Sequence, residues 1–293
     1  MFGSLKIGRP FGINTYIHGT FWLLPAFVLL QGLLSGNGLE MAVVDVAVLL
    51  TIFGCVALHE LGHALAARGF GIRTRDIVLY PIGGVARLDR MPRRPWQEIV
   101  VALAGPAVNV GIVLFLAPLM MLDGYSLHPN GYFESHVEVF WNRVLWGNVV
   151  LFLFNLIPAF PMDGGRVLRA LAAMVTSREQ ATAFAANVGA GFAVLFGLGG
   201  LLGGQFMPLV LAFFLFTAGR AELAAVRQEE DRRRYYGPAA EDAHEATVFD
   251  VPIARPVNEP TARPVDGWEY DPRRRVWVEW RDGYPVRVAR GNE

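Results

Sequence analysis

Cysteine is almost absent from the chain, and so is any excess of charge of one sign. Cys55 is the single cysteine among 293 residues, so no disulfide can form within the chain. Its place in an apolar run favours a packed thiol over a redox group. The 26 basic and 26 acidic residues cancel, which leaves no broad positive field for nucleic acid. The sequence therefore excludes an intrachain disulfide framework and predicts no nucleic-acid partner.

Charge of either sign is also scarce. Charged residues make up 18% of the chain, hydrophobic residues make up 53%, and the mean hydropathy is +0.36. This hydrophobic content exceeds what the core of a soluble protein needs. The sequence predicts an all-α polytopic membrane protein whose partner is the lipid bilayer. About six apolar stretches approach the ~20 residues of a transmembrane helix: residues 19–36, 41–66, 97–122, 141–161, 181–203 and 206–226.

The ends of the first and last stretches are the least defined. Pro25 and Gly32 interrupt the first stretch, and only residues 203–205 separate the last two. The first stretch carries no convincing small-residue cleavage site. It is therefore expected to remain in the membrane as an anchor.

Basic residues alternate between the connections. Lys and Arg occur before the first stretch, between the second and third, and between the fourth and fifth. The connections around residues 35–40, 123–138 and 203–205 contain neither. Because basic residues in short loops favour the cytoplasmic side, we expect both termini in the cytoplasm. The predicted location is the cell (plasma) membrane, as a multi-pass protein.

Three ionisable residues lie together inside the second apolar stretch. His59, Glu60 and His63 form the pattern H-E-x-x-H. Two histidines four residues apart lie on one helical face, so both imidazoles can reach one zinc ion, and the adjacent glutamate can act as a general base. The alternative is a chance pattern on an amphipathic helix. The cost of three ionisable groups in a membrane helix favours a metal site.

A third ligand is expected from residues 155–166, at the end of the fourth stretch. Asp163 offers a carboxylate, which completes a catalytic zinc site together with two imidazoles. Pro158 and Pro161 break the helix, and Gly164 and Gly165 permit tight turns, so Asp163 is expected to project from irregular backbone. The alternative is a helix-ending turn at the membrane surface.

Together these motifs resemble the site-2 protease family of intramembrane zinc metalloproteases. That family pairs H-E-x-x-H on one helix with a later N-x-x-P-x-x-P-x-D-G element, and the resemblance covers about residues 10–226. It implies one zinc ion per chain, with His59, His63 and Asp163 as ligands. It also implies that Glu60 is catalytic and that Asn155 contacts the substrate backbone or stabilises the oxyanion.

Residues 104–109 also look like the G-P-x-x-N element that the family carries in the third span. Asn109 can be read in two ways, either as a polar contact between helices or as a group with a direct catalytic role. The sequence leaves both interpretations open.

The resemblance implies the hydrolysis of peptide bonds in or near transmembrane segments of other membrane proteins, as in regulated intramembrane proteolysis. Single-span and other membrane proteins are the expected substrates, and assembly into a homo-oligomer stays open. One alternative is a membrane metal-binding or transport protein without hydrolytic activity. Another is an inactive relative that only holds membrane proteins. The glutamate of the motif argues against the first, because a transporter needs no general base there. The intact Glu60, His59 and His63 argue against the second.

A short cytoplasmic β-hairpin is expected between the second and third stretches. Residues 76–80 and 85–88 read as strands joined through residues 81–84. An unwound substrate could pair with its edge by strand addition. The alternative is a purely structural hairpin at the membrane surface.

The composition changes after residue 226, where the membrane-embedded domain 1–226 is expected to end. Residues 227–266 read as a charged and Pro-rich linker. Residues 267–293 suggest a small three-stranded β-meander. Such a tail is marginal alone, so it binds a peptide, docks elsewhere on the chain or stays partly disordered.

Overall fold

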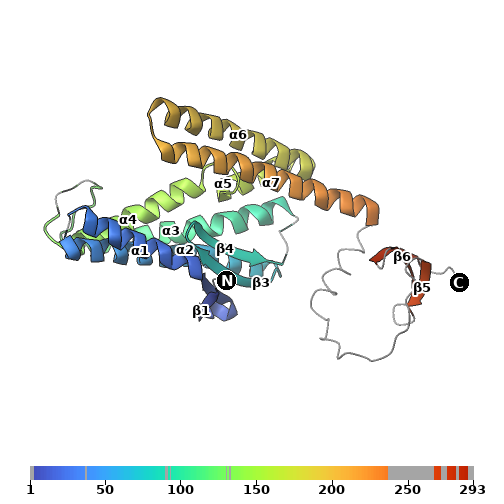
Figure 1. Cartoon of the computed structure of the whole chain (residues 1–293), viewed down its shortest axis with the longest axis horizontal. Helices are drawn as coiled ribbons and strands as arrows, with labels where there is room; N and C mark the ends of the chain where they lie inside the picture. The colour runs from blue at the N-terminus through green and yellow to red at the C-terminus, as the bar shows by residue number, and fades with distance from the viewer. Residues whose placement is uncertain are drawn as a thin grey trace. The chain divides into compact units, whose positions relative to one another are not determined.

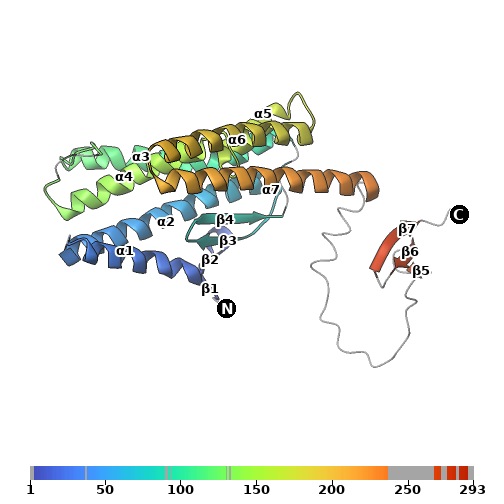
Figure 2. The same ribbon diagram turned by 45° about the horizontal axis from the view of Figure 1, so that its top comes forward.

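The computed structural model describes residues 3–36, 38–89, 92, 94–129, 131, 133–236, 267–271, 276–281 and 284–289. The chain divides into two compact units, Met1–Tyr235 and Tyr236–Glu293. Figures 1 and 2 show the path of the chain in two views. The first unit contains all the residues predicted to form the metal site.

Helices make up most of the first unit. They are α1 (Leu23–Leu34), α2 (Gly38–Gly69), α3 (Pro95–Leu122), α4 (His136–Asn155), α5 (Asp163–Ala172), α6 (Arg178–Leu202) and α7 (Phe206–Tyr236). Two short 3₁₀ helices, η1 (Pro10–Gly12) and η2 (Gly19–Trp22), precede α1. Among the described residues, five helices are long and apolar enough to cross a membrane, namely α2, α3, α4, α6 and α7. Residues Gly19–Leu34 form a shorter apolar helix, so the sixth predicted span stays a prediction.

Large apolar side chains cover the outside of these helices. Leu114 and Phe115 of α3, Leu195 of α6 and Phe213 of α7 are each more than 60% exposed. Exposed apolar surface on this scale is unfavourable in water and favourable against lipid. The architecture confirms the predicted class of a mostly helical polytopic membrane protein.

Two predicted helix ends differ from the structure. The fourth stretch was expected to run to residue 161, but α4 ends at Asn155, because the prolines at 158 and 161 prevent its continuation. Helix α7 runs past residue 226, where a linker was expected, and ends at Tyr236. The added residues are mostly Arg, Glu and Gln, which are strong helix formers whatever their polarity. The rest of the predicted linker, residues 237–266, lies outside the described residues.

The predicted hairpin is present and belongs to a larger sheet. Strand β3 (Thr74–Tyr80) pairs antiparallel with β4 (Gly83–Leu88). Strands β1 (Ser4–Gly8) and β2 (Asn14–His18) extend it to a four-stranded sheet of order β1-β2-β3-β4. No strand was predicted before residue 19. Strand β2 runs parallel to β3, which requires a long crossover connection, and helices α1 and α2 provide it.

Helix α2 is the centre of the unit. It packs against α1, α3 and α4 and against strands β3 and β4. A Cβ atom added at Gly62 of α2 would lie 2.7 Å from the carbonyl oxygen of Ala104 on α3. Small residues allow helices in membranes to approach this closely. The glycine of the H-E-L-G-H segment therefore brings α3 against the face that carries the two histidines.

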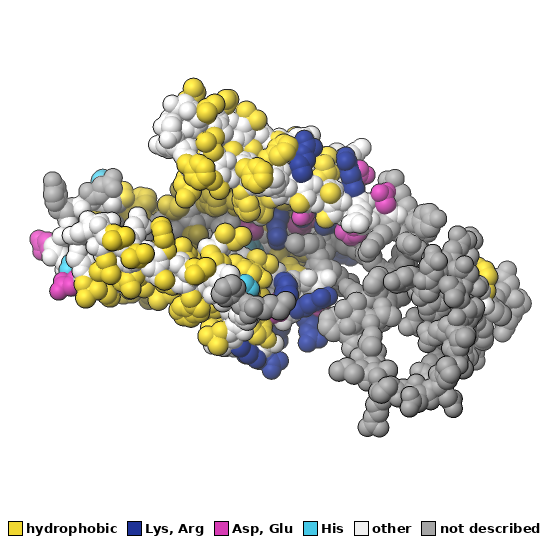
Figure 3. Space-filling model, in the orientation of Figure 1, with side chains coloured by type: hydrophobic (Ala, Val, Ile, Leu, Met, Phe, Trp, Pro, Cys, Tyr) yellow, Lys and Arg dark blue, Asp and Glu magenta, His cyan; other side chains and the backbone are white. Residues whose placement is uncertain are grey.

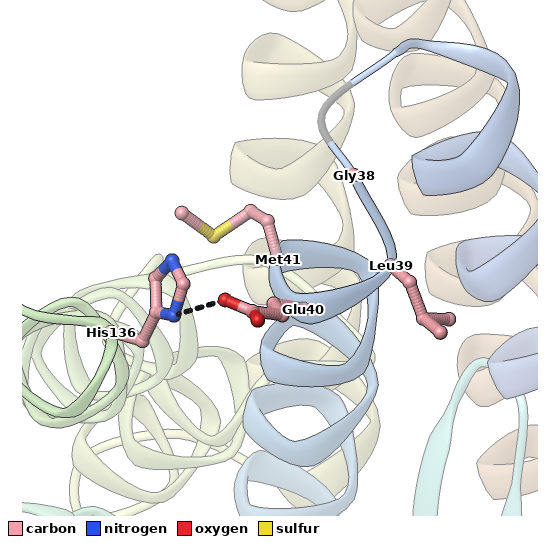
Figure 4. Close-up of a pocket in the computed structure, with 5 residues that line it drawn as sticks. All are labelled: Gly38, Leu39, Glu40, Met41 and His136. Atoms are coloured by element: carbon pink, nitrogen blue, oxygen red, sulfur yellow. Dashed lines mark ion pairs between the residues drawn. The ribbon is translucent and has the colours of Figure 1, made fainter.

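The two ends of the helices differ in their side chains. In Figure 3 the dark blue Lys and Arg side chains gather towards the end that carries the sheet, and hydrophobic side chains cover the helices between the ends. A pocket at the opposite end is lined by Gly38, Leu39, Glu40, Met41 and His136. There His136 Nδ1 lies 3.5 Å from a carboxylate oxygen of Glu40 (Figure 4). This pocket is at the N-terminal end of α2, far along the helix from His59.

The second unit contains three described strands. They are β5 (Gly267–Asp271), β6 (Val276–Arg281) and β7 (Tyr284–Ala289), and they pair antiparallel in the order β5-β6-β7. These strands lie in the segment for which a three-stranded meander was expected.

Candidate metal centre

His59, His63 and Asp163 converge at one point in the first unit. His59 Nε2 and His63 Nε2 lie 3.0 Å apart. They lie 3.1 Å and 3.2 Å, respectively, from Asp163 Oδ2. All three side chains are buried. Within the described residues, this is the one group of His, Cys, Asp or Glu whose atoms are arranged to hold a metal ion.

The chain brings the carboxylate to the histidines by a turn between two helices. Residues 156–162 follow α4 without regular structure, and α5 begins at Asp163. A Cβ atom at Gly164 or Gly165 would collide with the backbone of this turn, so both glycines allow α5 to start against it. The expectation that Asp163 projects from irregular backbone was wrong. The irregular segment ends one residue earlier, and Asp163 occupies the first turn of a helix.

The second ring nitrogen of each histidine is held by a hydrogen-bond acceptor. His59 Nδ1 lies 2.6 Å from Asn109 Oδ1, and His63 Nδ1 lies 2.7 Å from the Val101 carbonyl oxygen. Both oxygens only accept, so each Nδ1 carries the proton. Each Nε2 then directs a lone pair towards the carboxylate oxygen. Two neutral imidazoles and one carboxylate are a ligand set of catalytic zinc, and the geometry fits it.

Asp163 is present in the form that a metal requires. Burial alone would raise the pKa of its carboxyl, but its contacts with His59 and His63 and the positive charge of Arg166 outweigh burial and lower that pKa. The carboxyl group is therefore ionised at neutral pH. Metal ligands bind in their deprotonated form.

Helix α3 carries the G-P-x-x-N element against the two histidines. Gly105 lies so close that an added Cβ atom would collide with His63 Nε2 and lie 2.7 Å from His59 Nε2. Asn109, four residues on, is fully buried and contacts His59. The glycine therefore leaves room for the ligands. Of the two interpretations of Asn109, the structure supports the contact between helices and shows that its partner is a predicted zinc ligand.

Glu60 contacts the sheet. Its Oε2 accepts a hydrogen bond of 3.1 Å from the backbone N–H of Ala86 on β4. A Cβ atom added at Gly84 would lie 2.7 Å from Glu60 Cγ, so the first half of β4 lies directly on this side chain. The edge of β4 that does not pair with β3 therefore faces the glutamate of the motif. The sequence predicted the hairpin but could not show which edge faces the site.

Asn155 is the last residue of α4 and is partly buried. Its Nδ2 donates to the Leu151 carbonyl oxygen of the same helix, at 2.9 Å. The hydrogen bond therefore ties the amide to its own helix in this structure. Its role in catalysis stays a prediction.

A buried arginine fixes α5, and with it Asp163. The Arg169 side chain is fully buried, and its Nε donates to Glu98 Oε1 of α3 at 2.8 Å. It also forms an ion pair with Glu222 of α7. From the sequence, this arginine was expected only to be one of the basic residues that set orientation. The structure shows that it links the helix of the third ligand to two others.

Comparison with known proteins identifies the family of the chain. The chain matches the model of peptidase family M50 over residues 47–133 and 118–198. The chain belongs to peptidase family M50. A solved site-2 protease from Methanocaldococcus jannaschii shares 31% sequence identity with a TM-score of 0.53, over 75% of this chain and 95% of that one.

Curated relatives of the chain include proteins named as zinc metalloproteases. A zinc metalloprotease of Methanocaldococcus jannaschii is 34% identical over 229 residues, which are 77% of this chain and 62% of that protein. A putative zinc metalloprotease of Synechocystis is 31% identical over 259 residues, 83% of this chain and 65% of that protein. The chain thus spans less than two thirds of the length of each. Stage IV sporulation protein FB of Bacillus subtilis is 28% identical over 226 residues.

Family and fold together define the setting of the site. A member of family M50 with five long apolar helices is a multi-pass membrane protein. The relatives named as zinc metalloproteases imply zinc as the metal. Within the described part of the chain, the cluster of two histidines and one aspartate is the place where such an ion fits.

Proposed function

We propose that the chain is an intramembrane zinc metalloendopeptidase that hydrolyses peptide bonds in or near transmembrane segments of other membrane proteins. Its substrates would be single-span or other membrane proteins cut in regulated intramembrane proteolysis. The observation that carries the proposal is the convergence of His59, His63 and Asp163, with Glu60 beside them, in a member of family M50. One zinc ion per chain is the proposed content.

Each residue has a defined task in this reaction. A zinc ion held by the three ligands supplies Lewis acidity, which acidifies water and polarises a peptide carbonyl. Glu60 accepts a proton as the water oxygen bonds to the carbonyl carbon, and returns that proton to the amine nitrogen as the C–N bond breaks. Asn155 is proposed to donate from its amide to the substrate backbone or to the oxyanion. For that, its Nδ2 has to turn away from the Leu151 carbonyl.

The sheet offers a way to hold the substrate. A helical substrate uses its carbonyl groups in intrahelical hydrogen bonds, so the segment to be cut must first unwind. An extended segment can pair with the free edge of β4, where the Ala86 N–H faces the site. That N–H is bound to Glu60 in this structure. If a substrate paired there, the Ala86 N–H would donate to a substrate carbonyl instead of to Glu60. Glu60 would then be free to accept a proton.

The proposal includes the orientation of the helices in the membrane. The alternation of basic connections supports cytoplasmic termini in the cell membrane. The end that carries the sheet would then face the cytoplasm, and cleavage would take place near that surface. Unwinding costs less there than at the middle of the bilayer, because water can satisfy the freed backbone groups.

A cleavage assay with purified full-length protein tests the proposal. The protein is incubated with a panel of single-span membrane proteins, with and without a zinc chelator, and products are followed by mass. We expect cleavage that stops with chelator and returns when zinc is added. Cleavage that the chelator does not affect would contradict a metal mechanism. Zinc binding without cleavage of any substrate would instead favour a metal-binding or transport protein.

A further inference from the structure

Behind the metal cluster, a buried asparagine on α4 contacts the asparagine that holds His59. Asn148 is fully buried, and its Oδ1 accepts a hydrogen bond of 2.9 Å from Asn109 Nδ2. Asn109 Oδ1 in turn lies 2.6 Å from His59 Nδ1. The contacts form one line from α4 through α3 to α2. No motif in the sequence singles out Asn148.

The other contacts of Asn148 fix which way its amide faces. Its Nδ2 lies 2.9 Å from the Val144 carbonyl oxygen and 3.4 Å from Cys55 Sγ. The carbonyl oxygen can only accept, and the sulfur can act as a weak acceptor. The amino group is therefore committed on that side, and the amide oxygen must face Asn109.

The orientation of the Asn148 amide also determines the tautomer of the metal ligand His59. Because Asn148 presents an acceptor, Asn109 must direct its amino group towards α4 and its oxygen towards α2. That oxygen requires a proton on His59 Nδ1, which leaves the Nε2 lone pair for the metal. His63 needs no such side-chain relay, because a backbone carbonyl, that of Val101, holds its Nδ1.

We propose that Asn148 is a positioning residue for the metal centre, and that it acts through Asn109 to fix the tautomer and ring orientation of His59. The inference rests on the metal-binding part of the proposed function and goes beyond it by assigning this residue. Without the acceptor on α4, the Asn109 amino group would be left unpaired in an apolar interior, which is costly. The Asn109 amide could then rotate and present its amino group to His59.

Two substitutions separate this role from simple packing. Asn148→Leu keeps a branched side chain of similar shape without polar atoms. Asn148→Asp keeps an acceptor oxygen for Asn109. We expect Asn148→Leu to weaken zinc affinity about tenfold, at the lower end of the range for partners of metal ligands. Asn148→Asp should recover most of that affinity, although a buried carboxyl group is a poorer packing substitute than leucine.

Asn142 provides a matched control on the same helix. It is 1% exposed, and its Nδ2 donates to the carbonyl oxygens of Ser126 and His128, at 2.8 Å and 3.2 Å. These contacts do not lead to His59. Asn142→Leu should therefore lower the thermal stability of the protein and leave its zinc affinity unchanged.

The experiment uses the full-length chain in a Glu60→Gln background, so that zinc binding is read without proteolysis. Zinc affinity is measured by competition with a chromophoric chelator, and the absorption spectrum with cobalt reports the geometry of the ligands. We expect weaker zinc binding and an altered cobalt spectrum for Asn148→Leu but not for Asn142→Leu. Combined with Asn109→Leu, Asn148→Leu should add no further loss, because both act through one contact.

Unchanged zinc affinity and cobalt spectrum in Asn148→Leu would overturn the inference while leaving the metal site intact. An equal loss in Asn142→Leu, or a loss in Asn148→Asp as large as in Asn148→Leu, would also overturn it and point to general destabilisation. A Glu60→Gln parent that binds no zinc would overturn the metal site itself. Normal zinc binding in a wild-type protein that cleaves nothing would contradict the protease and leave the role of Asn148 standing.

Discussion

The two histidines of the cluster differ in what holds their second ring nitrogen. A backbone carbonyl, that of Val101, orients His63, so its orientation depends on the fold of α3 and not on any one side chain. Two asparagines in series orient His59. Because a carbonyl of the backbone cannot be removed by substitution, we expect side-chain changes near the site to act mainly through His59.

The roles of Asp163 and Asn155 should separate in a direct comparison. Asp163→Ala removes one of three ligands, so the protein should lose both zinc and cleavage. Asn155→Ala should retain zinc and lose about 10²–10³ in turnover, the typical cost of one oxyanion donor. Zinc content by elemental analysis and a cleavage assay measure the two effects. Equal zinc content in wild type and Asp163→Ala would remove Asp163 from the ligand set.

Residue patterns predicted the ligands better than their partners. The spacing of His59 and His63 fixes one helical face, and a carboxylate between prolines and glycines suggested Asp163. The partner of Asn109 could not be predicted, because it depends on how three helices far apart in sequence pack together. For the same reason the role of Asn148 could not be predicted, because the sequence shows it only as one polar residue in an apolar stretch.

At the scale of elements, α5 is short and owes its position to Arg169. Its ten residues are too few for an isolated helix to be stable. A buried ion pair from Arg169 to Glu98 of α3 and a partly exposed one to Glu222 of α7 hold it in place. The position of Asp163 therefore depends on a charged contact that lies outside the metal site.

Removal of this contact should be strongly destabilising. Arg169→Met leaves Glu98 buried without its main partner, and we expect a loss of about 3–5 kcal/mol in the free energy of unfolding. Arg227→Ala breaks an exposed ion pair with Glu179 and should cost no more than about 1 kcal/mol. Unfolding in detergent, followed by circular dichroism, compares the two. The double variant Arg169→Met/Glu98→Gln should recover part of the loss, and equal stability of Arg169→Met and Arg227→Ala would contradict this role.

The elements themselves were predictable to different degrees. The long apolar helices and the β3–β4 hairpin followed from hydropathy and from alternation between turn residues. Strands β1 and β2 were missed, because β2 is defined by parallel pairing with a strand about 60 residues later in the chain. Arg169 was read as a basic loop residue, since its partners on α3 and α7 come from distant parts of the chain.

At the scale of the whole molecule, the mechanism depends on which end of the helices faces the cytoplasm. Val175 lies exposed between α5 and α6, and Gln205 lies exposed between α6 and α7. In a Cys55→Ser background, Val175→Cys should resist an impermeant thiol reagent on intact cells, and Gln205→Cys should react. After lysis both should react. Labelling of Val175→Cys and protection of Gln205→Cys in intact cells would invert the proposed orientation.

Glu60 is proposed as the base of a zinc-dependent hydrolysis, and one comparison tests this role most directly. Wild type and Glu60→Gln are purified in parallel, and zinc content and cleavage of one membrane substrate are measured on the same samples. Glutamine keeps the size of the side chain and spares both imidazoles, but it cannot accept the proton. We predict equal zinc content and no detectable cleavage by Glu60→Gln. Cleavage by that variant at the wild-type rate would contradict the account.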